Sequence, residues 1–172
     1  VTLWDAATGE KRREMQCGGL VCSVALSSDG ATIVSGDDSN KVTLWDAATG
    51  EKRREMQCGG EVRSVALSSD GATIVSGDGS NKVTLWDAAT GEMRHEMECD
   101  GTLSSVALSS DGATIVSGHG MYDPYTSVQN QNKNSTATMV TLWDAATGKK
   151  RCEMQCGGEV RSVALSSDGA TV

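Results

Sequence analysis

The feature that most constrains this chain is an internal repeat with a period of 41 residues. Trp4, Trp45 and Trp86 are spaced by that period, and Trp143 follows after 57 residues, which is one period plus an insertion of 16. Four of the six cysteines recur with the same three intervals. A fixed period of roughly 20–50 residues is typical of proteins in which each repeat is one supersecondary unit stacked on its neighbours. The period therefore decides the architecture before any local propensity does.

Each unit contains four short segments with strand character, separated by turn sequences. In the second unit the first segment, 62–68, has a near-continuous apolar centre, which is typical of a strand covered on both faces. An Asp-Gly turn follows, a strong hairpin signal, and leads to a second strand at 72–77. The third strand, 82–87, alternates its side chains between two faces. The fourth, 92–97, is mostly charged, as expected of a solvent-facing edge.

Four antiparallel strands with short connections describe one blade of a β-propeller. The units resemble WD40 repeats: LWDAATG begins at Leu3, Leu44, Leu85 and Leu142, and SVALSSDG followed by IVSG matches the inner hairpin of that family. We therefore expect an all-β, WD40-type propeller fragment that forms one domain, with three complete blades and two half blades. The expected units are a half blade at 1–17, blades at 20–58, 61–99 and 102–156, and a half blade at 159–172.

The half blades at the two ends carry complementary strands, a third and a fourth at the start and a first and a second at the end. Since WD40 repeats usually form rings of about seven blades, we expect an open arc with unpaired strand edges. Self-association through the split blades is a further expectation. The chain starts without an initiator Met, which favours a part of a longer polypeptide.

The resemblance has departures. Where the family has a Gly-His pair before the first strand, the second unit has Gly59 and Gly60 after Cys58. The resemblance implies that this family histidine joins an Asp, a Ser and the Trp in a buried hydrogen-bond network. Ser76 and Trp86 are present here, but Ser80 stands where the Asp is expected. We therefore expect the blades to be held mainly by packing.

Composition excludes several functions. A net charge of −8 and 3% aromatic residues argue against binding nucleic acid, which needs clustered cations or stacking platforms. No apolar run approaches the roughly 18 residues of a membrane span, so no membrane partner is expected. Equivalent cysteines on different blades should not meet, which predicts reduced thiols and a cytoplasmic or nuclear location.

An enzymatic function has little support in the sequence. Only His95 and His119 could act as a base near neutral pH, and no nucleophile with supporting spacing lies near either in sequence. The acidic turns lack the ligand spacing of a calcium loop. We expect no catalytic residues, no cofactor and no metal.

The near-identity of the units shows which positions vary. The first two units differ only at the start of the innermost strand and in the loop after the second strand, and both places lie at one end of a blade. The resemblance implies that WD40 domains commonly bind partners at that end. The alternative is drift at tolerant exposed sites. The candidate partner-binding residues there are Leu20, Cys22, Asp38, Glu61, Arg63, Gly79, Thr102, Ser104, Glu159 and Arg161.

The insertion at 119–139 carries the only Pro and both Tyr residues. It is either a contact loop, with Tyr122, Asp123 and Tyr125 binding a partner, or a disordered polar insertion. For the whole chain we expect a scaffold that binds proteins or peptides. The alternatives are a sensor or structural portion of a larger multidomain protein, with a nucleotide-binding or kinase-like domain elsewhere, and a fragmentary repeat without a selected function.

Overall fold

The computed structural model describes residues 1–120 and 138–172, and its regular elements are all β-strands. They lie in one two-stranded and three four-stranded antiparallel sheets. The strands are β1 (Thr2–Trp4), β2 (Lys11–Glu14), β3 (Val21–Leu26), β4 (Thr32–Asp37), β5 (Lys41–Asp46), β6 (Lys52–Gln57), β7 (Val62–Leu67), β8 (Thr73–Asp78), β9 (Lys82–Asp87), β10 (Met93–Glu98), β11 (Thr102–Leu108), β12 (Thr114–Gly120), β13 (Thr138–Asp144) and β14 (Lys150–Cys156). The described part contains no helix long and apolar enough to cross a membrane.

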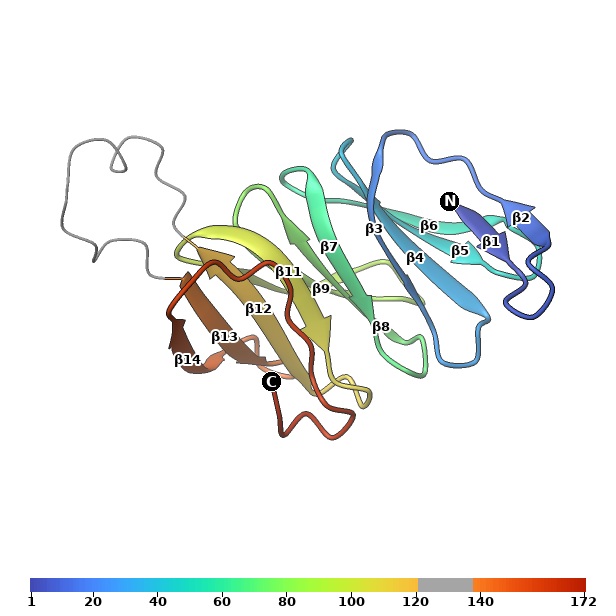
Figure 1. Cartoon of the computed structure of the whole chain (residues 1–172). Coiled ribbons are helices and arrows are strands. Elements are labelled where there is room, and N and C mark those ends of the chain that lie inside the picture. The colour runs from blue at the N-terminus through green and yellow to red at the C-terminus, as the bar shows by residue number, and fades with distance from the viewer. Residues whose placement is uncertain (121–137) are drawn as a thin grey trace.

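The sheets stand side by side in chain order, as Figure 1 shows. Within each sheet, strands that follow one another in the chain are hydrogen-bonded neighbours, so every blade is an up-and-down meander. The first strands β3, β7 and β11 contact one another from blade to blade, which makes them the inner strands of the arc. The expected all-β fold, with four-stranded antiparallel blades and no closed ring, is confirmed.

The second half blade differs from the expectation. Residues 157–172 contain no strand, although the Ser166–Thr171 hairpin turn forms, with the Ser166 N–H donating to the Thr171 carbonyl at 2.9 Å. The ladder is missing because residues 170–172 match only 72–74, whereas β7 pairs with β8 as far as Asp78. The two halves also fall short of a whole blade. Val172 is equivalent to Ile74 and Val1 to Val83, so neither half contains the equivalents of residues 75–82.

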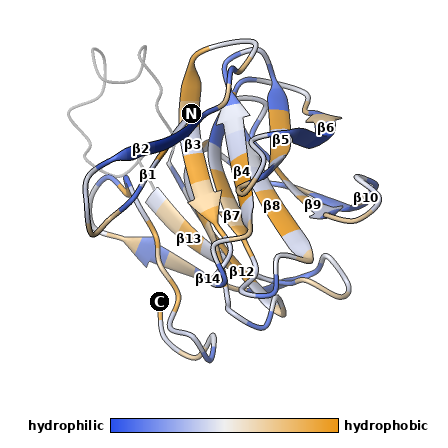
Figure 2. Ribbon diagram, turned by 90° about the vertical axis from the view of Figure 1, so that its right-hand side faces the viewer, coloured by the Kyte–Doolittle hydropathy of each residue, from blue (hydrophilic) through white to orange (hydrophobic). Residues whose placement is uncertain are grey.

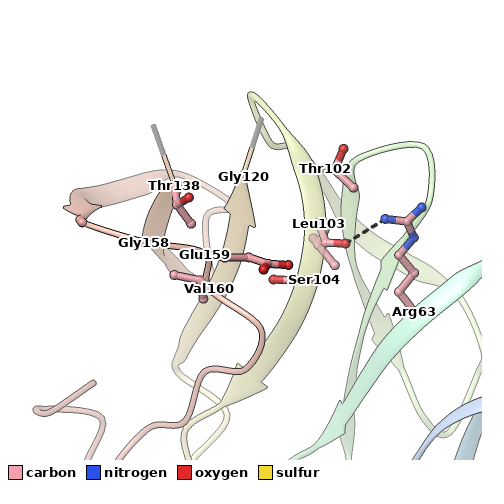
Figure 3. Close-up of a pocket in the computed structure, with 10 residues that line it drawn as sticks. Arg63, Thr102, Leu103, Ser104, Gly120, Thr138, Gly158, Glu159 and Val160 are labelled. Atoms are coloured by element: carbon pink, nitrogen blue, oxygen red, sulfur yellow. Dashed lines mark hydrogen bonds between the residues drawn. The ribbon is translucent and has the colours of Figure 1, made fainter. Parts of the chain in front are cut away.

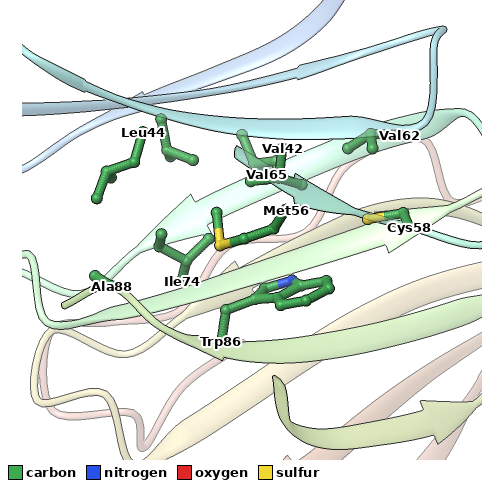
Figure 4. Close-up of a cluster of buried hydrophobic side chains, with 10 residues drawn as sticks. Val42, Leu44, Met56, Cys58, Val62, Val65, Ile74, Trp86 and Ala88 are labelled. Atoms are coloured by element: carbon green, nitrogen blue, oxygen red, sulfur yellow. The ribbon is translucent and has the colours of Figure 1, made fainter. Parts of the chain in front are cut away.

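Each blade is fixed to the preceding one by its tryptophan (Figure 4). Trp86 is 6% exposed and belongs to one cluster with Val42, Leu44 and Met56 of the blade before it. The same packing recurs around Trp45 and Trp143 in the neighbouring junctions. Because a propeller blade is covered on both faces, β5 and β9 are buried almost throughout.

A buried polar chain accompanies this packing, in which a thiol joins the Ser and the Trp that the sequence indicated. The Trp86 indole N–H donates to Ser76 Oγ at 2.8 Å, and Cys58 Sγ lies 3.5 Å from the same oxygen. The first and third complete blades repeat the arrangement. The small, weakly polar thiol fits against the serine hydroxyl in each of these places.

Serine side chains join neighbouring blades along the inner strands. Ser23 Oγ accepts from the Val65 N–H at 3.1 Å, and Ser64 Oγ accepts from the Val106 N–H at the same distance. In the turns, Ser28 Oγ donates to the Ser69 carbonyl at 2.7 Å. These bonds tie one blade to the next, and the repeat places them at equivalent positions in successive junctions.

The insertion is shorter than the sequence indicates. The break was expected at 119–139, but β12 continues through His119 to Gly120 and β13 begins at Thr138, where Gly120 pairs with Thr138. The extra ladder pairs lengthen this hairpin beyond those of the other blades. Tyr122, Asp123 and Tyr125 lie outside the described residues.

Candidate functional site

The positions at which the first two repeats differ, together with their equivalents in the other blades, form one series, which we call the variable row. It runs along the same end of the inner strands and of the loops after the second strands. Its described members are Leu20, Cys22, Asp38, Glu61, Arg63, Gly79, Thr102, Ser104, Glu159 and Arg161. They are the ten sequence candidates that the structure describes.

Contacts link the members of the variable row within and between blades. The Leu20 N–H donates to Asp38 Oδ1 at 2.8 Å, which joins the start of the inner strand to the loop after β4. Cys22 Sγ lies 3.7 Å from Glu61 Oε1 in the next blade. Arg63 Nη1 donates to the Leu103 carbonyl at 3.2 Å, one blade further on.

A backbone irregularity explains why the row faces outward. The pairing of β3 with β4 shifts between Val21 and Ser23, which leaves Cys22 as the extra residue of a β-bulge. The same shift leaves Arg63 unpaired in β7 and Ser104 unpaired in β11. A bulge re-aims the side chain that it carries, and bulges are frequent beside binding sites. The sequence comparison located these positions but gave no sign of the bulge.

Four members of the variable row meet around a cavity of about 720 Å³ (Figure 3). Arg63 comes from β7, Thr102 and Ser104 from β11, and Glu159 from the segment after β14. Val160 and other residues near the ends of β12 and β13 complete its wall. The remaining candidates do not line this cavity. They extend the row toward the first blade, with Leu20 75% exposed at its end.

The cavity carries charges of both signs. Arg63 points toward β11 from one side (Figure 3), and the Glu159 carboxylate lies on the other with Arg161 Nη2 at 3.1 Å. Serine and threonine hydroxyls lie between them. Such a lining offers donors and acceptors to a polypeptide backbone together with one charged group of each sign. Within the described residues no group of three or more His, Cys, Asp or Glu is placed to hold a metal ion.

Thiols near the row are not reactive. Burial raises the pKa of Cys58 to about 11, so this thiol is protonated at neutral pH. Burial and the Glu61 carboxylate also raise the pKa of Cys22. A nucleophilic cysteine needs a lowered pKa, so neither residue is suited to covalent catalysis.

One functional position was missed in the sequence. Asp78 is 1% exposed at the end of β8, and its Oδ1 accepts from the N–H groups of Ser80 at 2.9 Å and Lys82 at 3.3 Å. It therefore shapes the loop that carries Gly79. The signal was available, because an Asp two residues before a Ser and three before an Asn is typical of a side chain that caps a turn.

In the third complete blade His119 takes the position of that aspartate. It is 2% exposed, and its Nε2 lies 2.9 Å from Thr141 Oγ1, which in turn donates to Glu153 at 3.3 Å. Burial lowers the pKa of His119. The histidine is thus part of the blade interior and does not face the cavity, which removes it as a candidate base.

Comparisons with known proteins agree on the fold. The chain is similar to Kuenenia stuttgartiensis hydrazine synthase, with 21% identity over 87% of this chain and a TM-score of 0.71, and to U3-55K, with 16% identity over 81% and a TM-score of 0.65. The chain spans 40% of the length of each of these structures. No curated protein matches it in sequence.

The family comparison covers almost the entire chain. A family model described as the outer membrane protein assembly factor BamB matches residues 1–168. The two solved structures support the propeller fold, as does the blade arrangement, but none of these findings distinguishes the WD40 type from other propellers. The chain therefore belongs to the β-propeller family of the outer membrane protein assembly factor BamB.

Proposed function

We propose that this chain is a non-catalytic scaffold that binds proteins or peptides along the variable row. The observation that carries the proposal is the coincidence of sequence variation with the bulges at Cys22, Arg63 and Ser104. The first two repeats, which are otherwise identical, differ where a distorted backbone presents side chains at the surface and in the loop beside it. The exposed outer strands also vary between later repeats, with Met93 and His95 of β10 in place of Lys52 and Arg54 of β6, so drift at tolerant exposed sites stays the alternative.

The cavity beside Arg63 and Glu159 sets the kind of partner. Its volume of about 720 Å³ is large enough for several side chains of an extended peptide. The lining of hydroxyls and single charges suits a peptide that carries both an acidic and a basic side chain. A net charge of −8 disfavours nucleic acid as the partner.

The comparisons support a binding role. The family description names an assembly factor, which is a role in bringing proteins together. We retain the WD40 type as a proposal on the strength of the recurring LWDAATG and SVALSSDG sequences. We also propose a cytoplasmic or nuclear location, because thiols such as Cys22 stay unpaired most readily in a reducing compartment.

A second candidate function is a sensor or structural portion of a larger multidomain protein. The observation in its favour is that the chain spans 40% of the length of the similar structures. Flanking sequence distinguishes the two candidates. A nucleotide-binding or kinase-like domain next to these repeats favours the second, and further blades alone favour the first.

The binding proposal is tested with a phage-displayed library of random peptides. Peptides enriched on the 172-residue chain are synthesised, and their affinities are measured by fluorescence anisotropy. Arg63→Glu should weaken binding by about tenfold or more, because it replaces a cation at the cavity wall with an anion. Lys149→Glu makes the same charge change in the turn between β13 and β14, at the opposite end of the blade, and serves as the control. Equal affinities for both variants would contradict the proposed site.

A further inference from the structure

The third complete blade has a buried histidine where the other two complete blades have an aspartate. His119 is 2% exposed in β12, and the equivalent residues are Asp37 in β4 and Asp78 in β8. Each aspartate accepts from two backbone N–H groups that follow it in the chain. Histidine is the side chain whose charge ordinarily changes between pH 5 and 8. This blade therefore contains an ionisable group of a different kind at the end of its second strand.

A chain of hydrogen bonds runs from this histidine to the outer strand of the blade. His119 Nε2 lies 2.9 Å from Thr141 Oγ1 in β13, and that hydroxyl donates to Glu153 Oε1 in β14 at 3.3 Å. A threonine hydroxyl has one proton, and an ionised carboxylate can only accept. The proton of Thr141 is therefore engaged with Glu153, so Nε2 of the neutral histidine carries a hydrogen and donates to Thr141.

The charged groups of the described chain that face His119 are Glu153 and Lys150 of β14 and Asp100, which precedes β11. Strand β14 is the outer strand of its sheet and is partly blue with hydrophilic residues in Figure 2. Lys150 Nζ lies 3.2 Å from Glu153 Oε1 and 3.5 Å from Asp100 Oδ2. A proton on His119 would therefore add a buried positive charge beside carboxylates that already share a cation.

The surroundings of the histidine favour its neutral form. Burial lowers the pKa of His119 from its ordinary 6.5, the Glu153 and Asp100 carboxylates oppose this shift, and Lys150 adds to it. A conformation in which the imidazole reaches water binds a proton more readily than the closed blade does. Acid therefore shifts the population toward that open conformation.

The strand segment that holds His119 is also a wall of the cavity (Figure 3). Gly120 lines the cavity, and so does Thr138, its pairing partner in β13. On the other side of β12, Ser104 lines the cavity and its Oγ donates to the Gly118 carbonyl at 2.9 Å. The residues immediately before and after the histidine thus hold the lining in place, so opening of the strand at His119 displaces that lining.

We propose that His119 makes peptide binding at this cavity pH-dependent, because its protonation opens the adjoining pairs of β12 with β13 and removes part of the binding surface. The inference rests on the proposed function, since it assigns a regulator to the same site. Binding and protonation are then linked in both directions. A peptide that holds the cavity wall closed must also lower the pKa of His119 further.

The first test measures the affinity of the library-selected peptides at about pH 7.5 and about pH 5 by fluorescence anisotropy. The wild type should bind about threefold or more weakly at the lower pH, because its apparent affinity follows the fraction of chains in the binding-competent conformation. His119→Asn keeps a donor for Thr141 and does not titrate, so its affinity should change less. Both proteins contain Glu159, so any effect of this carboxylate cancels in the comparison. Equal losses in the two proteins would overturn the proposal.

An NMR titration of the wild type covers the case in which the substitution itself weakens binding. The ring signals of His119 are identified by their absence from the spectrum of His119→Asn. They are then followed with pH in the free chain and in the chain saturated with peptide. The pKa of His119 should be lower in the complex, and equal values in the two states would refute the linkage.

Hydrogen exchange of the free chain separates this inference from the proposed function. Lowering the pH from about 7.5 to about 5 should increase the opening of the amides in 118–120 and 138–141 more in the wild type than in His119→Asn. The two proteins are compared at the same pH, so the intrinsic pH dependence of exchange cancels. Equal exchange in both would refute the opening whether or not a peptide binds. A clear difference without any enriched peptide would instead overturn the proposed function, and pH-dependent binding with it.

Discussion

Replacing the tryptophans one at a time tests whether the blade junctions hold the structure. In Trp86→Ala the cluster with Val42, Leu44 and Met56 loses its largest member, and Ser76 loses the indole that donates to it. A buried Trp→Ala change of this kind costs about 3–5 kcal/mol. That is a large share of the roughly 5–15 kcal/mol by which a domain is stable.

Trp4→Ala provides the matched control within the same chain. Its side chain has the same size and the same place in the repeat, but it is 57% exposed where Trp86 is 6% exposed. With less than half of its surface buried, the substitution should cost about 1–2 kcal/mol. The difference between the two variants isolates burial in a complete junction from every local effect of the repeat sequence.

Urea denaturation followed by circular dichroism measures both losses, at a concentration low enough to keep the chain monomeric. The midpoint should fall clearly more for Trp86→Ala than for Trp4→Ala, with Trp45→Ala close to Trp86→Ala. If Trp4→Ala lowers the midpoint as much as Trp86→Ala does, junction packing is not what stabilises the blades. Fluorescence quenching of an indole that is accessible in the folded Trp4→Ala variant would point the same way.

Three further predictions concern the third blade, its histidine and the outer ion pairs. Replacing residues 120–138 with the Gly-Ser-Asn of the second blade removes 16 residues in total. This should change the free energy of unfolding by less than about 1 kcal/mol, because the entropic cost of loop closure depends weakly on loop length. Thermal denaturation measures the change. Since burial lowers the pKa of His119 from its ordinary 6.5, the unfolded chain binds more protons, and stability should fall as the pH drops below about 6.5. His119→Asn should flatten that dependence in urea titrations at several pH values. The pKa of Asp87 is lowered to about 2, first by the Thr90 N–H and then by Arg94, so Arg94→Gln should raise it only part of the way to 3.8 in an NMR titration.

The repeat fold was largely predictable, because its signals are local and recur. Asp-Gly turns, alternating strands and a charged outer strand each specify a blade, and the structure has the four strands where the sequence indicates them. The second half blade failed because strand pairing is not a local property. The sequence 160–171 is identical to 62–73, which forms β7 and the start of β8, yet only the turn forms. What differs is the partner strand, because β7 pairs with β8 from Ile74 to Asp78 and this sequence holds no equivalents of residues 75–78 after Val172.

The candidate site was predictable in position but not in shape. Comparing the units located Cys22 and Arg63 as variable, since that needs only the alignment of the repeats with one another. The bulge that turns these side chains outward depends on how β3 pairs with β4 and β7 with β8, and a one-residue shift of register has no signature in the strand sequence. The thiol in the buried network was missed for a similar reason. Cys58 was interpreted from the sequence only as a reduced thiol, and its place 3.5 Å from Ser76 Oγ follows from how the strands are arranged.

Near-identical units make the junctions the decisive part of this molecule. A repeat that contacts only its neighbours gains stability from its own fold and from its interfaces, and here those interfaces are one solution used again. Equivalent hydrogen bonds between blades show how similar the junctions are. Arg54 donates to the Ala89 carbonyl, and in the next junction His95 Nε2, at the equivalent position, lies 3.0 Å from the Ala146 carbonyl oxygen. The contact survives the change of residue because the backbone that it joins is held by the tryptophan and the serines. The junction therefore tolerates a change of side chain at this position, as long as the new side chain still reaches the same carbonyl.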